Sequence, residues 1–275
     1  MLSVLILTLN EEINLPRCLK SVAWADDILV LDSFSTDATL AIAKDHGARV
    51  LQNHFVNFAE QRNFGLLHGN FKYPWILHLD ADEEVSPELR DELLAVVQSG
   101  DKDAYQLASK MMFQGHWLKH SGLYPWHQVR VGKREALTFI QVGHGQRENL
   151  NPARIGTLTN PLIHHSFAKG IHDWVEKHNR YSTAEARHFV DTIGKQPLDR
   201  MGLISTDPVR RKRALKHLFS FMPCRPLLRF LYMYFFRLGL LDGISGYHYC
   251  RLLSFYESMI VIKIRELQAK QHQSC

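Results

Sequence analysis

Apolar runs alternate with amphipathic segments through the N-terminal part of this 275-residue chain. The apolar runs are short and rich in Val, Ile and Leu, which predicts buried strands at residues 3–9, 27–31, 49–52 and 75–79. Helical spacing and helix start signals follow them, which predicts helices at residues 37–46, 60–68 and 86–97. This order predicts an α/β fold, in which helices cover both faces of a mostly parallel sheet.

The pattern changes beyond residue 100, and from residue 173 onward the spacing is helical. Between these points, loops that contain glycine and proline separate predicted strands at residues 105–110, 128–131 and 137–142.

These patterns divide the chain into three parts. A large α/β domain is predicted over residues 1–193, with a first half at 1–100 and a second half at 101–193. A linker at 194–207 leads to a basic, amphipathic helical region at 208–275.

Composition places the chain among ordinary globular proteins. Apolar residues make up 45% and charged residues 22%, which excludes disordered, collagen-like and disulfide-scaffold classes. The four cysteines form no CxxC pair, so neither a zinc site nor a disulfide framework is indicated, and a reducing cytoplasmic setting fits. The N-terminus lacks a positively charged segment before its short apolar run, so we expect no signal peptide.

The net charge of +5 is unevenly distributed. No acidic residue lies between Asp207 and Asp242, whereas eight lysines and arginines do. Arg225, Arg229 and Arg237 are spaced to share one side of a helix, with leucines and aromatic residues around the rest. This pattern favours residues 208–241 as a helical surface for an anionic membrane; the alternative is a helix packed on the domain with its arginines in water.

Polar residues follow three of the predicted strands: Thr8 to Glu12, Asp32 to Asp37, and Asp80 to Glu84. The carboxyl ends of parallel strands are where open α/β sheets bind ligands. Asp80 and Asp82, two positions apart, can converge on one hard cation such as Mg²⁺ or Mn²⁺, which commonly bridges to substrate phosphates. Each cluster taken singly is also explained by turn and helix-cap chemistry.

Four motifs in this order carry a resemblance: SVLILTLNEE, VLDSFSTDAT, AEQRNFGL and WILHLDADEEVSPEL. They resemble the nucleotide-sugar-binding half of family 2 glycosyltransferases, which have the GT-A fold, and more narrowly bacterial lipooligosaccharide β-1,4-glucosyltransferases. The similarity is specific over residues 2–100 and looser at 163–186 and 225–266. The resemblance implies an inverting enzyme that moves a hexose, with glucose first among candidates, from a UDP-sugar to a lipid-linked saccharide in lipopolysaccharide core or other cell-envelope glycan synthesis.

The resemblance also implies residue roles. Asp82 and His164 would bind Mg²⁺ or Mn²⁺, although the sequence leaves open whether His164 or His165 faces the metal and whether the imidazole instead hydrogen-bonds the diphosphate. Asp80 would hold the ribose or a metal-bound water. The other nucleotide-sugar contacts are implied for Thr8, Asn10, Glu11, Asp32 and Arg62. The enzyme would be cytoplasmic and peripheral on the inner face of the bacterial cytoplasmic membrane.

An inverting transferase needs a general base, and Glu148 is the candidate. Arg147 precedes it where relatives carry a His or an acid, and an adjacent cation would lower the carboxylate pKa. Two other classes of protein remain open at this point. One is a non-catalytic partner that keeps the GT-A fold. The other is a nucleic-acid-binding protein that uses the basic segment, although no known binding motif is present and no nucleic-acid partner is expected.

Overall fold

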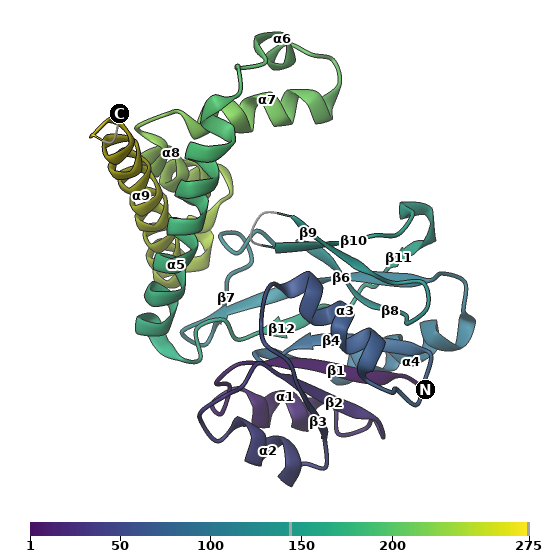
Figure 1. Cartoon of the computed structure of the whole chain (residues 1–275). Helices are drawn as coiled ribbons and strands as arrows, with labels where there is room; N and C mark the ends of the chain where they lie inside the picture. The colour runs from purple at the N-terminus through teal and green to yellow at the C-terminus, as the bar shows by residue number, and fades with distance from the viewer. Residues whose placement is uncertain (143–144, 274–275) are drawn as a thin grey trace. The chain divides into compact units, whose positions relative to one another are not determined.

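The computed structural model describes residues 1–142 and 145–273. The chain divides into two compact units, Met1–Gly170 and Ile171–Cys275, called here the N-terminal and C-terminal units (Figure 1). The predicted large domain ends at residue 193, whereas the contacts divide the chain after Gly170. The helix over residues 170–191 therefore belongs to the C-terminal unit. The expected division into a nucleotide-sugar-binding half at 1–100 and an acceptor half at 101–193 stays a prediction.

A mixed sheet forms the centre of the N-terminal unit, in the strand order β3-β2-β1-β4-β8-β6-β12-β5, with β7 and β11 paired to β6. The strands are β1 (Ser3–Thr8), β2 (Ile28–Asp32), β3 (Arg49–Gln52), β4 (Trp75–Asp80), β5 (Glu83–Glu84), β6 (Ala104–Phe113), β7 (His116–Trp117), β8 (His127–Lys133), β11 (Ile155–Thr157) and β12 (Leu162–His164). Strands β1 to β4 pair in parallel, as do β12 and β11 with β6, whereas β8 runs antiparallel to both β4 and β6. The predicted α/β class with a mostly parallel sheet is confirmed.

The helices of this unit are α1 (Leu15–Ser21), α2 (Thr39–Asp45), α3 (Phe58–His68), α4 (Pro87–Ser99) and the short η1 (Pro152–Arg154). Side-chain caps begin α3, α4 and η1, whereas α1 and α2 have none. The Ser86 side chain accepts a hydrogen bond from the Leu89 amide and caps α4, whose first residue is Pro87. Gly100 ends the same helix with φ of 68°, a left-handed conformation that glycine adopts without strain.

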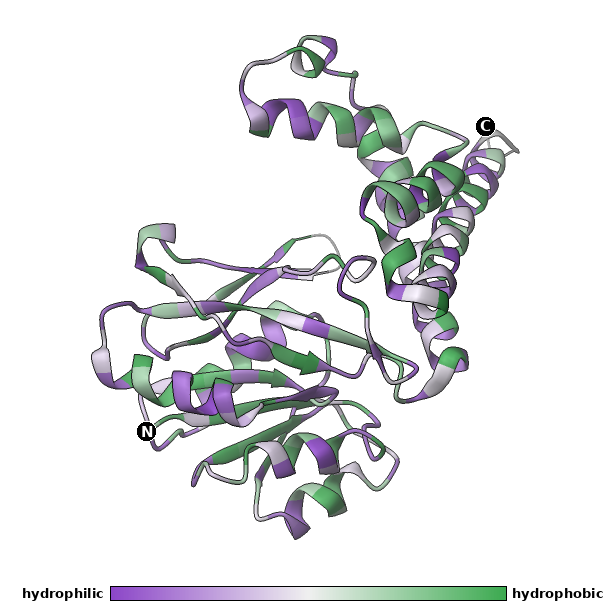
Figure 2. Cartoon of the chain, turned by 180° about the vertical axis from the view of Figure 1, so that it is seen from behind, coloured by the Kyte–Doolittle hydropathy of each residue, from purple (hydrophilic) through white to green (hydrophobic). Residues whose placement is uncertain are grey.

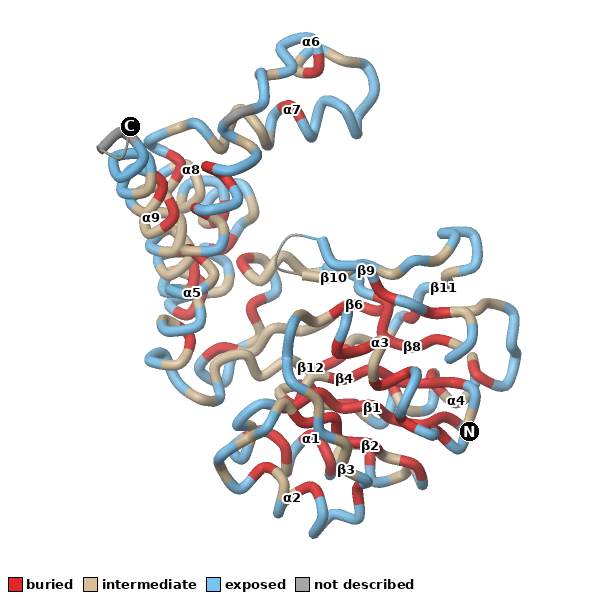
Figure 3. Tube along the Cα trace, in the orientation of Figure 1, coloured by how far each residue is buried: buried red, intermediate tan, exposed pale blue. Residues whose placement is uncertain are grey.

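Two apolar layers enclose the buried strand β1, whose alternate side chains point to opposite faces of the sheet. Val4 and Ile6 pack in one cluster with leucines of α1 and α4, and Leu5 and Leu7 pack in another with residues of α3. Figure 3 shows the burial concentrated along β1, β2 and β4. Helices therefore cover both faces, as predicted.

A separate two-stranded sheet is built from β9 (Phe139–Val142) and β10 (Gly145–Glu148). The Asn63 side chain of α3 holds it in place, because it donates to the Phe139 carbonyl at 2.8 Å and accepts from the Phe139 amide at 2.9 Å.

The C-terminal unit is helical, as predicted for residues 208–275. Its helices are α5 (Gly170–Asp191), η2 (Ile193–Lys195), α6 (Arg200–Leu203), α7 (Pro208–Ser220), α8 (Arg225–Leu231), the π-helical turn η3 (Tyr232–Phe236), η4 (Gly239–Asp242) and α9 (Gly243–Gln273). Phe189 and Val190 of α5 pack against Ile260 and Ile264 of α9. The predicted linker contains α6, which Asp199 caps through the Gly202 amide at 2.8 Å. None of the helices in the described residues is both long enough and apolar enough to cross a membrane.

Candidate active site

Asp32 organises the carboxyl ends of β1 and β2. Its buried carboxylate accepts hydrogen bonds from the Thr8 hydroxyl at 2.9 Å, the Ser35 amide at 2.8 Å and the Gln52 side chain at 3.2 Å. The loop after β2 is thereby fixed against the ends of β1 and β3. Both carboxylate oxygens accept hydrogen bonds within the protein, so the buried Asp32 side chain holds the loop and the strand ends in position.

Asn10 and Glu11 form the outer part of the same edge. Asn10 has a left-handed backbone with φ of 55°, and its side-chain oxygen accepts from the Thr36 amide at 2.8 Å. Glu11 forms an ion pair with Lys169 at 2.6 Å and accepts from the Asn14 side chain at 2.8 Å. Burial raises the pKa of Glu11, and the hydrogen bonds from Lys169 and Asn14 oppose that effect. The structure thus brings the β1 and β2 clusters together and adds Lys169.

Asp80 lies in a buried network of charges. Its two oxygens contact separate arginines, Arg62 at 2.7 Å and Arg130 at 2.9 Å, and Arg130 also contacts Glu83 at 2.5 Å. The second oxygen of Glu83 accepts from the Asp80 amide at 2.9 Å. Burial favours the neutral form of Asp80, but the two guanidinium groups outweigh it and hold its pKa well below the usual range. Asp80 is therefore ionised and fixed in orientation.

Arg62 is only 1% exposed, and its contact with Asp80 holds that carboxylate in place. Direct contact of Arg62 with a nucleotide stays a prediction. Arg130 and Glu83 were not among the predicted site residues. The arginine between two valines in the buried middle of β8 was the available signal, because a buried charge requires a partner.

Asp82 and His164 meet at the other end of this network. Strand β12 pairs with β5 so that His164 lies opposite Glu83, and its Nε2 atom is 3.1 Å from the Asp82 carboxylate. His165 turns the other way and contacts Glu84 at 2.9 Å. Burial lowers the pKa of His164, but the charge of Asp82 outweighs this and raises it to about 9. Of the two neighbouring histidines, His164 is the one that faces Asp82.

The donor set of this pair suits a divalent cation with an incomplete protein shell. One carboxylate and one imidazole provide oxygen and nitrogen ligands, and Mg²⁺ or Mn²⁺ commonly takes its other ligands from water and substrate phosphates. No cluster of three or more His, Cys, Asp or Glu side chains suited to a metal occurs within residues 1–142 and 145–273. Metal binding by Asp82 and His164 stays a prediction.

Glu148, the predicted base, ends β10 and lies opposite Phe139 in the two-stranded sheet. Its side chain is half-buried. It lies in the small two-stranded sheet, whereas Asp32, Asp80 and Glu83 lie on strands of the main sheet. Its role as a base stays a prediction.

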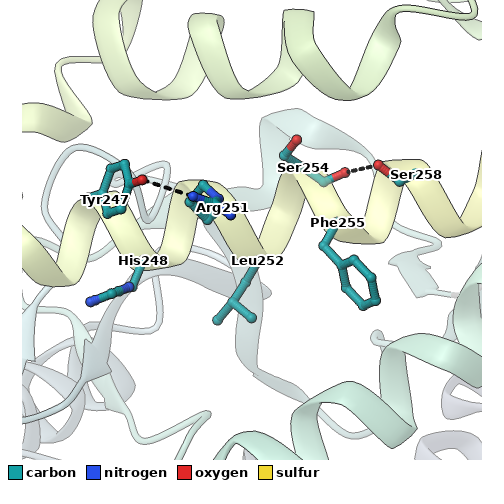
Figure 4. A pocket seen from close by; sticks show the side chains of 7 residues that line it. All are labelled: Tyr247, His248, Arg251, Leu252, Ser254, Phe255 and Ser258. Carbon is teal, nitrogen blue, oxygen red and sulfur yellow. Dashed lines mark hydrogen bonds between the residues drawn. The ribbon is translucent and has the colours of Figure 1, made fainter.

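A hollow of about 590 Å³ runs along α9 of the C-terminal unit, and none of the predicted site residues lines it (Figure 4). Its lining residues are Tyr247, His248, Arg251, Leu252, Ser254, Phe255 and Ser258. Polar groups in it are used internally, since Arg251 donates to the Tyr247 hydroxyl at 2.9 Å and the Ser258 hydroxyl donates to the Ser254 carbonyl at 3.0 Å.

A mostly parallel α/β sheet with acidic and polar side chains gathered after β1, β2 and β4 is typical of proteins that bind nucleotides. The sequence profile described as Glycosyl transferase family 2 matches residues 3–146, which is more than half of the chain. The chain therefore belongs to glycosyl transferase family 2, and it is a glycosyltransferase with the predicted fold class.

Curated relatives agree with this assignment. The chain is 27% identical to the lipopolysaccharide core biosynthesis glycosyltransferase LpsC of Rhizobium meliloti, over 98% of this chain and 93% of the relative. It is 30% identical to an uncharacterized glycosyltransferase of Rickettsia bellii, over 71% of this chain and 69% of that one.

Solved structures of glycosyltransferases are also similar. The mannosyltransferase PcManGT of Pyrobaculum calidifontis, in complex with GDP-Man and Mn²⁺, is 17% identical with a TM-score of 0.49, covering 96% of this chain and 86% of that one. Glucosyl-3-phosphoglycerate synthase of Mycobacterium tuberculosis, in complex with Mn²⁺, UDP-Glc and phosphoglyceric acid, is 18% identical with a TM-score of 0.47, covering 69% and 79%.

Proposed function

We propose that this chain is an inverting hexosyltransferase that transfers a hexose, with glucose as the first candidate, from a UDP-sugar to a lipid-linked saccharide of lipopolysaccharide core or another cell-envelope glycan. The observation that carries the proposal is the Asp82–His164 pair, held at 3.1 Å beside the edge formed by Thr8, Asp32 and Glu11. The lipopolysaccharide context comes from the name of the relative LpsC.

The residues divide into binding and positioning groups. Thr8, Asn10 and Glu11 would line the nucleotide pocket, and Asp32 would contact its uracil or ribose side. Asp80 would hold the ribose or a metal-bound water, oriented by its two arginines. Asp82 and His164 would hold Mg²⁺ or Mn²⁺, which stabilises the negative charge that develops on the leaving diphosphate.

The acceptor side rests on Glu148, which would take the proton from the attacking hydroxyl as the bond to the anomeric carbon forms. A lipid-linked acceptor is available only at a membrane surface, which is why we include peripheral attachment through residues 208–241 in the proposal. The absence of acidic residues from that segment supports attraction to anionic lipids.

The test is release of free nucleotide from a panel of UDP- and GDP-sugars, with Mn²⁺, with Mg²⁺ and after chelation. We expect turnover of a UDP-hexose that requires the metal, and loss of at least about 100-fold in Asp82→Ala, as for removal of a group that stabilises transition-state charge. Asp91→Ala, a matched loss of an exposed carboxylate on α4, should retain wild-type turnover.

Full activity of a folded Asp82→Ala variant would contradict the metal assignment. If calorimetry detects no binding of any nucleotide sugar in the presence of Mn²⁺ or Mg²⁺, the chain is instead a non-catalytic relative with the same fold.

A further inference from the structure

Helix α8 turns its arginines toward the protein and leaves leucines exposed, the reverse of what is expected for a helix on the surface of a water-soluble protein. Arg225 is buried and forms an ion pair with Glu257 of α9 at 2.6 Å, which corrects the expectation that it belongs to an exposed basic stripe. Arg229 and Arg237 are half-buried, and their Nε atoms have no hydrogen-bond partner within the described parts of the chain. The arginine side of α8 and η3 therefore faces the protein.

Large apolar side chains lie on the outside of the same segment. Phe236 is 82% exposed, which is extreme for a phenylalanine. Exposed large apolar residues within residues 231–244, here called the 231–244 surface, are Leu231, Tyr232, Phe235, Phe236, Leu238, Leu240, Leu241 and Ile244. In Figure 2 the helices of the C-terminal unit include long stretches of hydrophobic residues, drawn in green. Contiguous apolar exposure of this kind marks a surface that binds a partner or a membrane.

The backbone is adapted to this display. The turn at η3 is π-helical, with the Arg237 amide donating to the Tyr232 carbonyl at 2.8 Å, and this wider turn leaves both Phe235 and Phe236 outside. Leu238 then adopts a left-handed conformation with φ of 60°, which is unfavourable for a leucine. A sequence under no constraint to expose Leu238 would place glycine or asparagine there.

We propose that the 231–244 surface inserts into the interfacial region of a lipid bilayer, with the exposed basic residues of α7 in the same unit held at the level of the lipid headgroups. The inference rests on the membrane association within the proposed function, but it assigns the main attachment to apolar insertion and a secondary role to charge.

Charge decides between a bilayer and a second copy of this chain as the occupant. Asp242 is the one acidic residue in the stretch 208–244 and it is half-buried, whereas Arg211, Lys212 and Arg213 on α7 are exposed. Two copies would bring these cations toward one another, which disfavours association, whereas an anionic leaflet attracts them. Apolar and cationic groups together on one segment are typical of interfacial helices.

The experiment is sedimentation of the full chain with vesicles of phosphatidylcholine alone and of phosphatidylcholine with phosphatidylglycerol, at low and high salt. We expect wild type to bind the anionic vesicles with substantial binding left at high salt, because insertion is not screened. Phe235→Ser/Phe236→Ser should weaken binding roughly 100-fold, about tenfold for each aromatic ring withdrawn from apolar burial. Arg211→Gln/Arg213→Gln should weaken it less, and only at low salt.

Phe55→Ser, which removes an exposed phenylalanine from the N-terminal unit, is the matched control and should bind as wild type does. Vesicle binding within twofold of wild type in the double serine variant overturns the proposal, as does the absence of any binding by wild type. Light scattering that finds a dimer without lipid, lost in the double serine variant, identifies a second copy as the occupant and overturns it too. Nucleotide release from a soluble donor without vesicles should be unchanged in this variant, so failure of insertion and failure of the transferase assignment are distinguishable.

Discussion

Replacing Arg130 by methionine removes the cation that two carboxylates of the candidate site share. Arg130 contacts Asp80 at 2.9 Å and Glu83 at 2.5 Å, and Glu83 is 1% exposed. Asp80 keeps Arg62 as a partner in the variant, but Glu83 loses its cation while it remains buried. Breaking a buried ion pair from one side costs about 3–5 kcal/mol of unfolding free energy.

Most of that cost comes from the charge left behind, so removing the charge should restore stability. Glu83→Gln keeps an oxygen that can accept from the Asp80 amide, as Glu83 does at 2.9 Å. We expect Arg130→Met/Glu83→Gln to recover roughly half of the loss or more, which gives a coupling energy of about 1.5 kcal/mol or above in a double-mutant cycle.

Urea unfolding followed by tryptophan fluorescence measures these free energies. The matched control is Arg154→Met, which removes an exposed arginine that contacts Asp103 at 2.6 Å, and it should leave the transition almost unchanged. A loss below about 1 kcal/mol in Arg130→Met, or additivity in the double variant, would refute the view that this network is held together by buried charge.

Two further predictions follow from single contacts. Lys169→Met removes the cation that pairs with Glu11 and should raise KM for the donor several-fold with little change in kcat. Lys72→Met breaks an exposed ion pair elsewhere and should leave steady-state kinetics unchanged. Equal KM values in the two variants would contradict a role of the Lys169–Glu11 pair in donor binding. Gly65→Ala places a methyl group 2.7 Å from a leucine of β1 and should cost about 1–3 kcal/mol in urea unfolding. Gly145→Ala meets its nearest atom at 3.8 Å and should cost little, so similar losses in both would show that crowding is not the cause.

The parts of the fold that were predicted well are those that local pattern encodes. Strand β3 has the predicted bounds, and β1, β2 and β4 differ from theirs by a residue or two, because a buried strand is an uninterrupted apolar run between polar residues. Parallel order then places their carboxyl ends at one edge, which is why the polar clusters after β1 and β2 meet.

Contacts between distant segments were not accessible in the same way. Arg130 reaches Asp80 across 50 residues because β8 runs antiparallel beside β4, and no local pattern specifies that neighbour. Lys169 reaches Glu11 across 158 residues. The contact of Arg62 with Asp80 was equally inaccessible. Helical spacing predicts the side of the helix on which Arg62 lies, but only the fold determines that Asp80 is its partner.

The arginines of α8 show where periodicity stops being informative. A spacing of four and eight residues indicates that Arg225, Arg229 and Arg237 share a side of the helix, but it does not say whether that side faces water or protein. Glu257 on α9 decides the question, because its ion pair draws Arg225 inward and rotates the apolar side outward. Exposing so many apolar side chains to water is unfavourable, which is the physical basis for proposing that a bilayer receives them. The segment that was predicted to attract a membrane by charge therefore exposes, in the folded chain, a largely apolar set of side chains over residues 231–244.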